Sequence, residues 1–195
     1  MKVIGILLAA GFSTRFGTNK LLAPLPAEGP DGGAPVAVAA ARHLAEALPG
    51  PVAVVRPRAQ KVSKLLREAG CTTVICKNAA QGMGASLAAG VRAAEDADGW
   101  VIALADMPFV PAETIRLIAT ALEQGAAIAA PAHGGERGHP VGFARRFRDD
   151  LLALSGDQGA RQILKTYAHC ITLYETGDCG VLRDIDVPGD LAPSS

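Results

Sequence analysis

Two basic side chains follow the first apolar stretch of the sequence at a short spacing. The segment "LLAAGFSTRFGTNKLL" (residues 7–22) carries Arg15 and Lys20 on a loop that also contains Gly11 and Gly17. Glycines let a backbone bend so that its N–H groups line an anion site. An arginine grips phosphate oxygens as a planar fork, and a lysine supplies a compact charge. A triphosphate is the ligand that best accounts for this combination, although an ordinary solvated turn with two exposed cations is the simpler alternative.

Two familiar phosphate-binding motifs do not fit this chain. A Walker A loop requires GxxxxGK[ST], whereas five residues separate Gly11 from Gly17 and Lys20 comes three positions later. The dinucleotide motif GxGxxG fails as well, because "GMGASL" ends in Leu87 where the last glycine is required. The sequence therefore indicates a different kind of phosphate loop.

Carboxylates that could hold a divalent cation occur in two places. "VIALADMPFV" (residues 101–110) carries Asp106 off the end of an apolar run, and Mg²⁺ prefers oxygen ligands that it shares with phosphates. "RDIDVPGDL" (residues 183–191) holds Asp184, Asp186 and Asp190. Alternation along a strand would put Asp184 and Asp186 on one face, so that either could complete a metal site, while Asp190 would cap a terminal turn.

Three further segments contain polar or glycine residues at predicted element ends. "NAAQGMGASLAAGV" (residues 78–91) places Gly82 and Gly84 before a helix whose first turn holds Ser86, where backbone amides favour an anion or a carbonyl oxygen. A plain loop-to-helix join explains it equally well. His139 precedes Pro140 and so lies in extended backbone. Two later residues complete the set, with Asp157 predicted as a helix N-cap and Arg161 as a ligand for a second anion.

The elements that must present these residues follow from apolar runs and helical patterns that alternate along the chain. Strands are predicted at 2–10, 51–56, 72–77, 99–108 and 126–131, and helices at 35–48, 59–70, 85–97 and 111–123. After Pro131 we predict a strand at 139–143, helices at 145–154 and 157–168, and strands at 170–175 and 179–187. This order predicts an α/β fold, a three-layer α/β/α sandwich with a mostly parallel, Rossmann-like mixed sheet, in one domain over residues 1–195.

Composition narrows the classes of partner. The chain has 19 basic and 19 acidic side chains, and this balance argues against nucleic acid and membranes as partners. Its four cysteines form no CxxC motif, which favours buried or free thiols in a reducing cytoplasm. The apolar start could pass for a short signal peptide, but cleavage near Ala10 would detach the first strand from its loop. We therefore expect a cytoplasmic protein.

The ordered motifs resemble those of the MobA-like nucleotidyltransferases, in particular the molybdenum cofactor cytidylyltransferase branch. "LAAGFSTRFGTNKLL" is similar to the signature LAAGxSxRxGxxKxLL, with Phe16 where the family usually has Met and with "PAEGPDGG" as an insertion outside the site. "GMGASL", "LADMP", "DIDVPGD", "GHPVGF" and "SGDQGAR" resemble GMxxSL, LADMP, DIDTPxD, GHPVxF and GDxGAR. The resemblance covers residues 3 to about 191 and implies a fold of the nucleotide-diphospho-sugar transferase type.

The resemblance also implies roles for individual residues. Lys20, Arg15 and Asp106 would be catalytic, and Asp106 with Asp186 would bind Mg²⁺, with Mn²⁺ as an acceptable substitute. The nucleotide would contact Leu8, Ala9, Ala10, Gly11, Ser13, Arg15, Lys20, Gly82, Gly84 and Ser86. The acceptor would contact His139, Pro140, Asp157 and Arg161. Residues 1–110 would thus bind the nucleoside triphosphate, and residues 111–195 would bind the acceptor.

The activity implied is transfer of CMP from CTP to the terminal phosphate of molybdopterin or molybdenum cofactor, with release of pyrophosphate. Ala10 and "GMGASL" imply cytidine, since the guanylyl-transferring relatives carry LAGG and GPLAG at these places. A transient contact with the recipient molybdoenzyme or its chaperone would follow. Three alternatives stay open: a sugar- or polyol-phosphate acceptor, a nicotinamide-dependent oxidoreductase, and an idle carrier that binds the pterin without releasing pyrophosphate.

Overall fold

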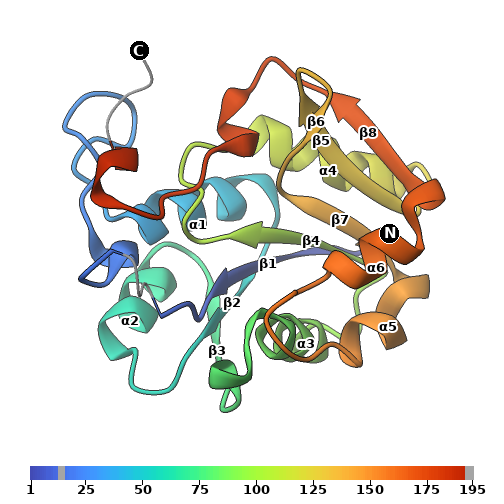
Figure 1. The fold of residues 1–195 in the computed structure, drawn as a ribbon, viewed down its shortest axis with the longest axis horizontal. Helices are drawn as coiled ribbons and strands as arrows, with labels where there is room; N and C mark the ends of the chain where they lie inside the picture. Colours follow the sequence, from blue (N-terminus) through green and yellow to red (C-terminus); the bar gives the residue numbers. More distant parts are fainter. Residues whose placement is uncertain (13–15, 192–195) are drawn as a thin grey trace.

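A twisted sheet runs through the centre of the molecule in the computed structural model, which describes residues 1–12 and 16–191 (Figure 1). The first four strands are β1 (Val3–Ala9), β2 (Val52–Val55), β3 (Thr72–Ile75) and β4 (Gly99–Leu104). The later strands are β5 (Ile128–His133), β6 (Glu136–Arg137), β7 (Val141–Ala144) and β8 (Ile171–Glu175). The order across the sheet is β3-β2-β1-β4-β7-β5-β6, with β8 paired to β5.

Strand directions divide the sheet into two parts. β1, β2, β3 and β4 are mutually parallel, so their carboxyl ends meet at one edge. β7 runs antiparallel to both β4 and β5, and β6 pairs antiparallel with β5. β8 is parallel to β5. The expected mostly parallel, mixed sheet is therefore confirmed.

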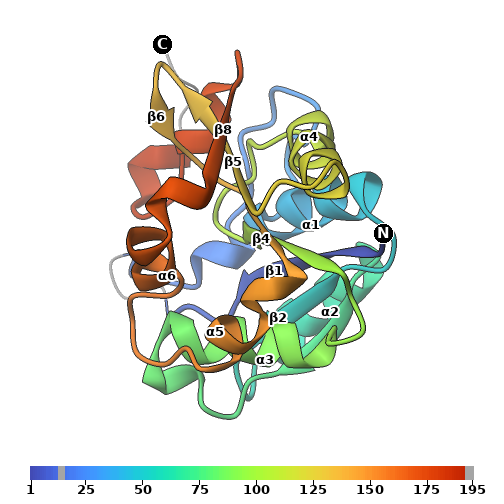
Figure 2. The same cartoon turned by 90° about the vertical axis from the view of Figure 1, so that its right-hand side faces the viewer.

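Helices cover both faces of the sheet and make three layers (Figure 2). One face packs against α1 (Val36–Ala47), α2 (Gln60–Glu68) and α4 (Ala112–Glu123) through Leu44, Leu66 and Ile118. The other face packs against α3 (Met83–Ala93), α5 (Arg148–Leu152) and α6 (Arg161–Thr166). Its core includes Trp100, whose ring is fully buried and whose Nε1 donates to the carbonyl of Ala94 at 2.9 Å.

The C-terminal part departs from the sequence-based expectation in two places. Residues 179–187 are not a strand: Cys179–Leu182 forms a 3₁₀ turn, and the residues after it have no regular structure. Val181 and Ile185 are both fully buried there although no strand forms. The helix predicted at 157–168 begins only at Arg161, since turns occupy the preceding four residues.

The remaining expectations concern cysteines and membrane spans. Cys71 and Cys76 flank β3 and are buried, Cys170 is half-buried and Cys179 is exposed, and all four thiols are free. Burial raises the pKa of the Cys71 thiol to about 11. Across residues 1–12 and 16–191, no helix has both the length and the apolar character of a membrane span.

Candidate functional site

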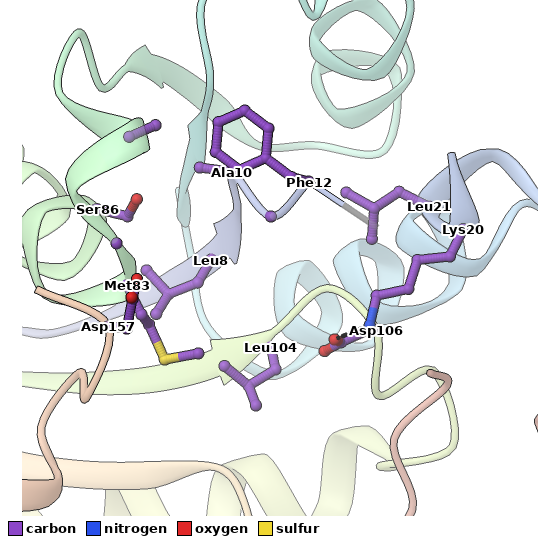
Figure 3. A pocket seen from close by; sticks show the side chains of 13 residues that line it. Leu8, Ala10, Phe12, Lys20, Leu21, Met83, Ser86, Leu104, Asp106 and Asp157 are labelled. Atoms are coloured by element: carbon purple, nitrogen blue, oxygen red, sulfur yellow. Dashed lines mark ion pairs between the residues drawn. The ribbon is translucent and has the colours of Figure 1, made fainter. Parts of the chain in front are cut away.

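The carboxyl edge of the parallel strands contains a cavity of about 280 Å³ (Figure 3). We call it the Lys20 cavity. Its walls come from the ends of β1 and β4, the loop after β1, and the start of α3. Its lining residues are Leu8, Ala10, Gly11, Phe12, Lys20, Leu21, Ala79, Gly82, Met83, Ser86, Leu104, Asp106 and Asp157. Ligands of parallel α/β sheets bind at this edge, so the cavity lies where the sheet topology predicts.

Lys20 holds two carboxylates together at one end of this cavity. Its Nζ lies 2.8 Å from Oδ2 of Asp106 and 2.9 Å from Oδ1 of Asp186. The lysine side chain is only 11% exposed, against 24% for Asp106 and 42% for Asp186. A charged lysine at this depth is stable because both carboxylates neutralise it.

Each of the three residues is held by its local backbone. Lys20 starts a 3₁₀ turn (Lys20–Leu22) whose N-cap Asn19 accepts a hydrogen bond from the N–H of Leu21 at 3.2 Å. Asp106 follows β4 in a turn whose neighbours, Ala105 and Met107, are buried. The chain reaches Asp186 from a distant part of the sequence, and its placement therefore depends on tertiary contacts.

The charges in this cluster shift each other's protonation. Burial alone would lower the pKa of Lys20, but its hydrogen bonds to Asp106 and Asp186 outweigh that effect and raise the pKa above its ordinary value. The ammonium therefore stays charged at neutral pH. Asp184 is a third carboxyl group beside this cluster. Desolvation and the negative charges of Asp186 and Asp106 raise its pKa.

The chemistry of these donors fits a divalent cation that shares its ligands with a substrate. Asp106 and Asp186 converge on one positive charge and offer hard carboxylate oxygens. In the described part of the chain, no three His, Cys, Asp or Glu side chains form a group that could hold a metal by themselves. Mg²⁺ is commonly bound by one or two carboxylates plus substrate phosphates, so two protein ligands suffice.

A second cavity, of about 420 Å³, adjoins the first, and we call it the Arg161 cavity. Leu8, Met83, Leu104 and Asp157 line both. The other lining residues are Leu87, Ile102, Arg137, His139, Val141, Phe143, Gln158, Ala160, Arg161 and Leu164. It therefore combines an apolar floor from β4, β7 and α3 with two arginines at its rim, a combination suited to an apolar or flat ligand that carries an anionic group.

His139 is held in its neutral form within this second cavity. Burial, with a smaller effect from the charge of Arg137, lowers the pKa of His139 to about 4, although Asp106 opposes the shift. Its Nδ1 is enclosed and has no hydrogen-bond partner within the described residues. The imidazole can therefore accept or donate a hydrogen bond at neutral pH but carries no charge.

Most of the predicted site residues gather around the two cavities. Leu8, Ala10, Gly11, Lys20, Gly82, Ser86 and Asp106 line the Lys20 cavity, and His139 and Arg161 line the Arg161 cavity. Asp186 joins the first group through Lys20. Ser13 and Arg15 lie outside the described residues.

Four predicted residues lie elsewhere or act differently. Ala9 is buried in the core against α1 and lines neither cavity. Gly84 faces the loop before α6, where a Cβ atom would lie 2.7 Å from the carbonyl oxygen of Ser155. Pro140 borders a small void behind His139. Asp157 lines both cavities but is not a helix N-cap, because Ala160 holds that position in α6.

Among the lining residues that the sequence analysis did not name, three could contact a ligand with an aromatic ring, a thioether or a charge. Phe12 is 51% exposed at the edge of the Lys20 cavity and stacks on Arg56, with 4.9 Å between the guanidinium carbon and the ring centroid. Met83 borders both cavities at the first position of α3. Arg137 lies on the two-residue strand β6, which is too short for a periodic signal. The aromatic residue directly after Gly11 was the available sequence clue for Phe12.

The chain is similar to known proteins along most of its length. A family model described as "MobA-like NTP transferase domain" matches residues 5–171. "Purine catabolism protein PucB" of Bacillus subtilis (strain 168) is 33% identical over an alignment of 201 residues, and this alignment covers 95% of this chain and 92% of that protein. The crystal structure of Rv0371c from Mycobacterium tuberculosis H37Rv is 26% identical, with a TM-score of 0.80 and coverage of 97% and 95%. Its complex with manganese is 25% identical, with a TM-score of 0.76 and coverage of 97% and 96%.

Proposed function

The chain belongs to the MobA-like NTP transferase domain family and is a nucleotidyltransferase, and we propose that it transfers CMP from CTP to a molybdopterin-type acceptor. The observation that carries this proposal is the pair of adjoining cavities. One has a lysine and two carboxylates at its end, and the other has an apolar floor with two arginines at its rim. A donor in the first cavity would meet an acceptor in the second across Leu8, Met83, Leu104 and Asp157.

The lining of the second cavity supports a conjugated acceptor over a sugar phosphate. A sugar presents hydroxyl groups on every side and needs hydrogen-bonding partners around it, whereas Leu87, Val141 and Phe143 offer none from their side chains. A flat heterocycle can lie on such a floor, while Arg137 and Arg161 meet its phosphate. This arrangement fits a pterin that ends in a phosphate group.

Cytidine is favoured by the sequence motifs. Ala10 and the "GMGASL" segment, whose Gly82, Met83 and Ser86 line the Lys20 cavity, resemble the cytidine-using branch of the family. Ser86 lines this cavity from the first turn of α3, so its hydroxyl is well placed to contact a nucleotide held there. The identity of the nucleotide base is tested directly by comparing the four nucleoside triphosphates.

Asp106 and Asp186 would hold the Mg²⁺ or Mn²⁺ ion, which would neutralise charge on the triphosphate. Lys20, already at these carboxylates, would add its positive charge to the same phosphates. The terminal phosphate oxygen of the acceptor is ionised at neutral pH, so it can attack the α-phosphorus without a protein base. That bond forms as the bond from the α-phosphorus to pyrophosphate breaks, and catalysis comes from alignment and charge neutralisation.

The test is a pyrophosphate-release assay with each of the four nucleoside triphosphates, with and without molybdopterin, in Mg²⁺ or Mn²⁺. We expect release only when CTP and molybdopterin are both present. A preference for GTP would overturn the cytidine assignment, and release with a sugar phosphate but not with molybdopterin would overturn the acceptor. Binding of the pterin without any release would identify a carrier, and a change in NAD(P)H fluorescence on mixing would point to an oxidoreductase.

A further inference from the structure

The residues around Asp186 lack the hydrogen-bond ladder of a strand. Residues 183–187 follow the 3₁₀ turn at Cys179–Leu182 and precede another at Pro188–Leu191. In Figure 1 this segment is part of the red ribbon to the left of the drawing. Some other set of contacts must therefore fix the direction of the Asp186 carboxylate.

The first of these contacts ties the segment to the end of β4. The N–H of Ile185 donates to the carbonyl oxygen of Asp106 at 2.9 Å, so the backbones that carry the two carboxylates are joined directly. The side chain of Ile185 is fully buried in a small cluster with Phe16, Leu25 and Val36. Ile185 thus anchors the segment in position but leaves the next peptide groups to be oriented.

Asp190 orients those peptide groups. Its Oδ2 accepts hydrogen bonds from the N–H of Asp186 and from the N–H of Val187, both at 2.8 Å. One oxygen therefore holds two consecutive amides, the one that precedes the Asp186 Cα atom and the one that follows it. The hydrogen bonds to Val187 and Asp186 lower the pKa of Asp190, so the carboxylate stays ionised throughout the neutral range.

We propose that Asp190 is a positioning residue for the metal site: it fixes the Asp186 backbone so that the Asp186 carboxylate meets Asp106 at the Lys20 cavity. The inference rests on the proposed function, since it takes Asp106 and Asp186 as the cation ligands. Outer residues that orient metal ligands through hydrogen bonds typically change metal affinity by about 10- to 100-fold when they are removed. Asp190 is such an outer residue, because it accepts a hydrogen bond from the backbone N–H of Asp186.

Two variants separate orientation from charge. Asp190→Ala removes the accepting oxygen, so we expect it to weaken Mn²⁺ binding by about 10-fold. Asp190→Asn keeps a side-chain oxygen that can accept both N–H groups but has no charge, so we expect affinity within about 3-fold of the wild type. Asp178→Ala is a matched control, because the Asp178 carboxylate also accepts a backbone N–H in the same C-terminal region, that of Gly180 at 2.8 Å.

The measurement is Mn²⁺ affinity from the electron paramagnetic resonance signal of free Mn²⁺, with the metal alone and with CTP present. Circular dichroism melting checks that each variant is folded, and Asp190→Ser replaces the alanine variant if that variant does not fold. Wild-type affinity in the folded Asp190→Ala or Asp190→Ser variant would overturn the proposal. Equal weakening in Asp190→Asn and Asp190→Ala would also overturn it, since charge rather than orientation would then be responsible.

Two further variants separate the role of Asp190 from the metal site of the proposed function. Asp106→Ala and Asp186→Ala should each weaken Mn²⁺ binding more than Asp190→Ala does. If both bind Mn²⁺ like the wild type, or if the wild type binds none in either condition, the metal site of the proposed function is wrong. If they lose affinity while Asp190→Ala keeps it, only the role of Asp190 is wrong.

Discussion

The parallel and the antiparallel parts of the sheet place their cavity residues by different means. In the parallel part, Gly11 and Asp106 come within two residues of the strands β1 and β4, and the shared strand direction brings both to one edge. In the C-terminal part, Arg137 lies on a two-residue strand, and Asp186 lies in a segment without regular structure. The position of Asp186 depends on the contacts of Ile185 and Asp190.

This difference suggests a division of labour that can be tested. Beside the ends of the parallel strands lies the buried Lys20, held by Asp106 and Asp186, which suits alignment of a phosphate chain. The antiparallel part contributes Val141, Phe143 and Arg137 to the Arg161 cavity, where apolar side chains and arginines suit recognition of an acceptor. Variants of the charged cluster at the Lys20 cavity should therefore reduce the rate of the chemical step, and variants of the arginines at the Arg161 cavity should weaken acceptor binding.

The largest effect is expected at Lys20. Lys20→Met removes the positive charge shared by Asp106 and Asp186, and loss of one preorganised charged group costs about 10²–10³ in kcat. Pyrophosphate release under saturating CTP and acceptor measures it. Lys64→Met, on the exposed face of α2, is the matched control and should retain wild-type kcat. Near wild-type turnover in folded Lys20→Met would show that Lys20 does not contribute to the chemical step, contrary to this comparison.

Arg161 should show the opposite kinetic pattern. Arg161→Ala removes a guanidinium from the rim of the second cavity, and a hydrogen bond to a charged group contributes about 1.5–3 kcal/mol, or about 10- to 100-fold in acceptor KM. The KM for CTP should stay unchanged. Arg92→Ala, exposed near the end of α3, serves as the control. A rise in the KM for CTP instead would mean that the two parts do not divide the substrates in this way.

His139 gives the antiparallel part a pH dependence of stability. Because the pKa of His139 falls from 6.5 in the unfolded chain to about 4 in the folded protein, the unfolded state binds the extra proton between these values. The stability is full above about pH 6.5 and decreases as the pH falls, by about 2 kcal/mol between pH 7 and pH 5. Urea unfolding at both pH values should show a smaller decrease in His139→Gln than in wild type or in His169→Gln. Equal decreases in the free energy of unfolding in all three proteins would contradict this role of His139.

Ser86 should give the smallest effect of the set. Ser86→Ala removes one buried hydroxyl from the Lys20 cavity, and a neutral hydrogen bond is worth about 0.5–1.5 kcal/mol, or about 3- to 10-fold in the KM for CTP. The KM for the acceptor should not change. Ser63→Ala, on α2, provides the control. A change in the KM for the acceptor alone would mean that Ser86 contacts the acceptor and not the nucleotide.

The parallel part was also the part that the sequence predicted well. Its strands are apolar runs whose loops begin where the run stops, so the order of residues alone was enough to place Gly11 and Asp106 at one edge. Lys20 could be placed near that edge, but its pairing with Asp186, 166 residues away, could not. Such a pair depends on the path by which the C-terminal segment returns to the end of β1. The periodicity of apolar residues does not encode that path.

The C-terminal part was predicted less well for the same physical reason. Val181 and Ile185 are fully buried although residues 179–187 form no strand, so their burial depends on tertiary packing that the sequence pattern does not show. Asp157 resembled an N-cap, yet two glycines with positive φ, Gly156 and Gly159, keep the residues around it in turns and delay α6 to Arg161. Arg137 gave no periodic signal at all, because β6 contains only two residues.

The shared border of the two cavities bears on how such an enzyme would be inhibited. Leu8, Met83, Leu104 and Asp157 face both spaces, so a dinucleotide would occupy both at once through a single pyrophosphate bridge. Tethering makes the second half of such a molecule bind at a high effective concentration. The reaction product would then leave slowly, and a hydrolysis-resistant mimic of it would block the enzyme more strongly than analogues of either substrate alone.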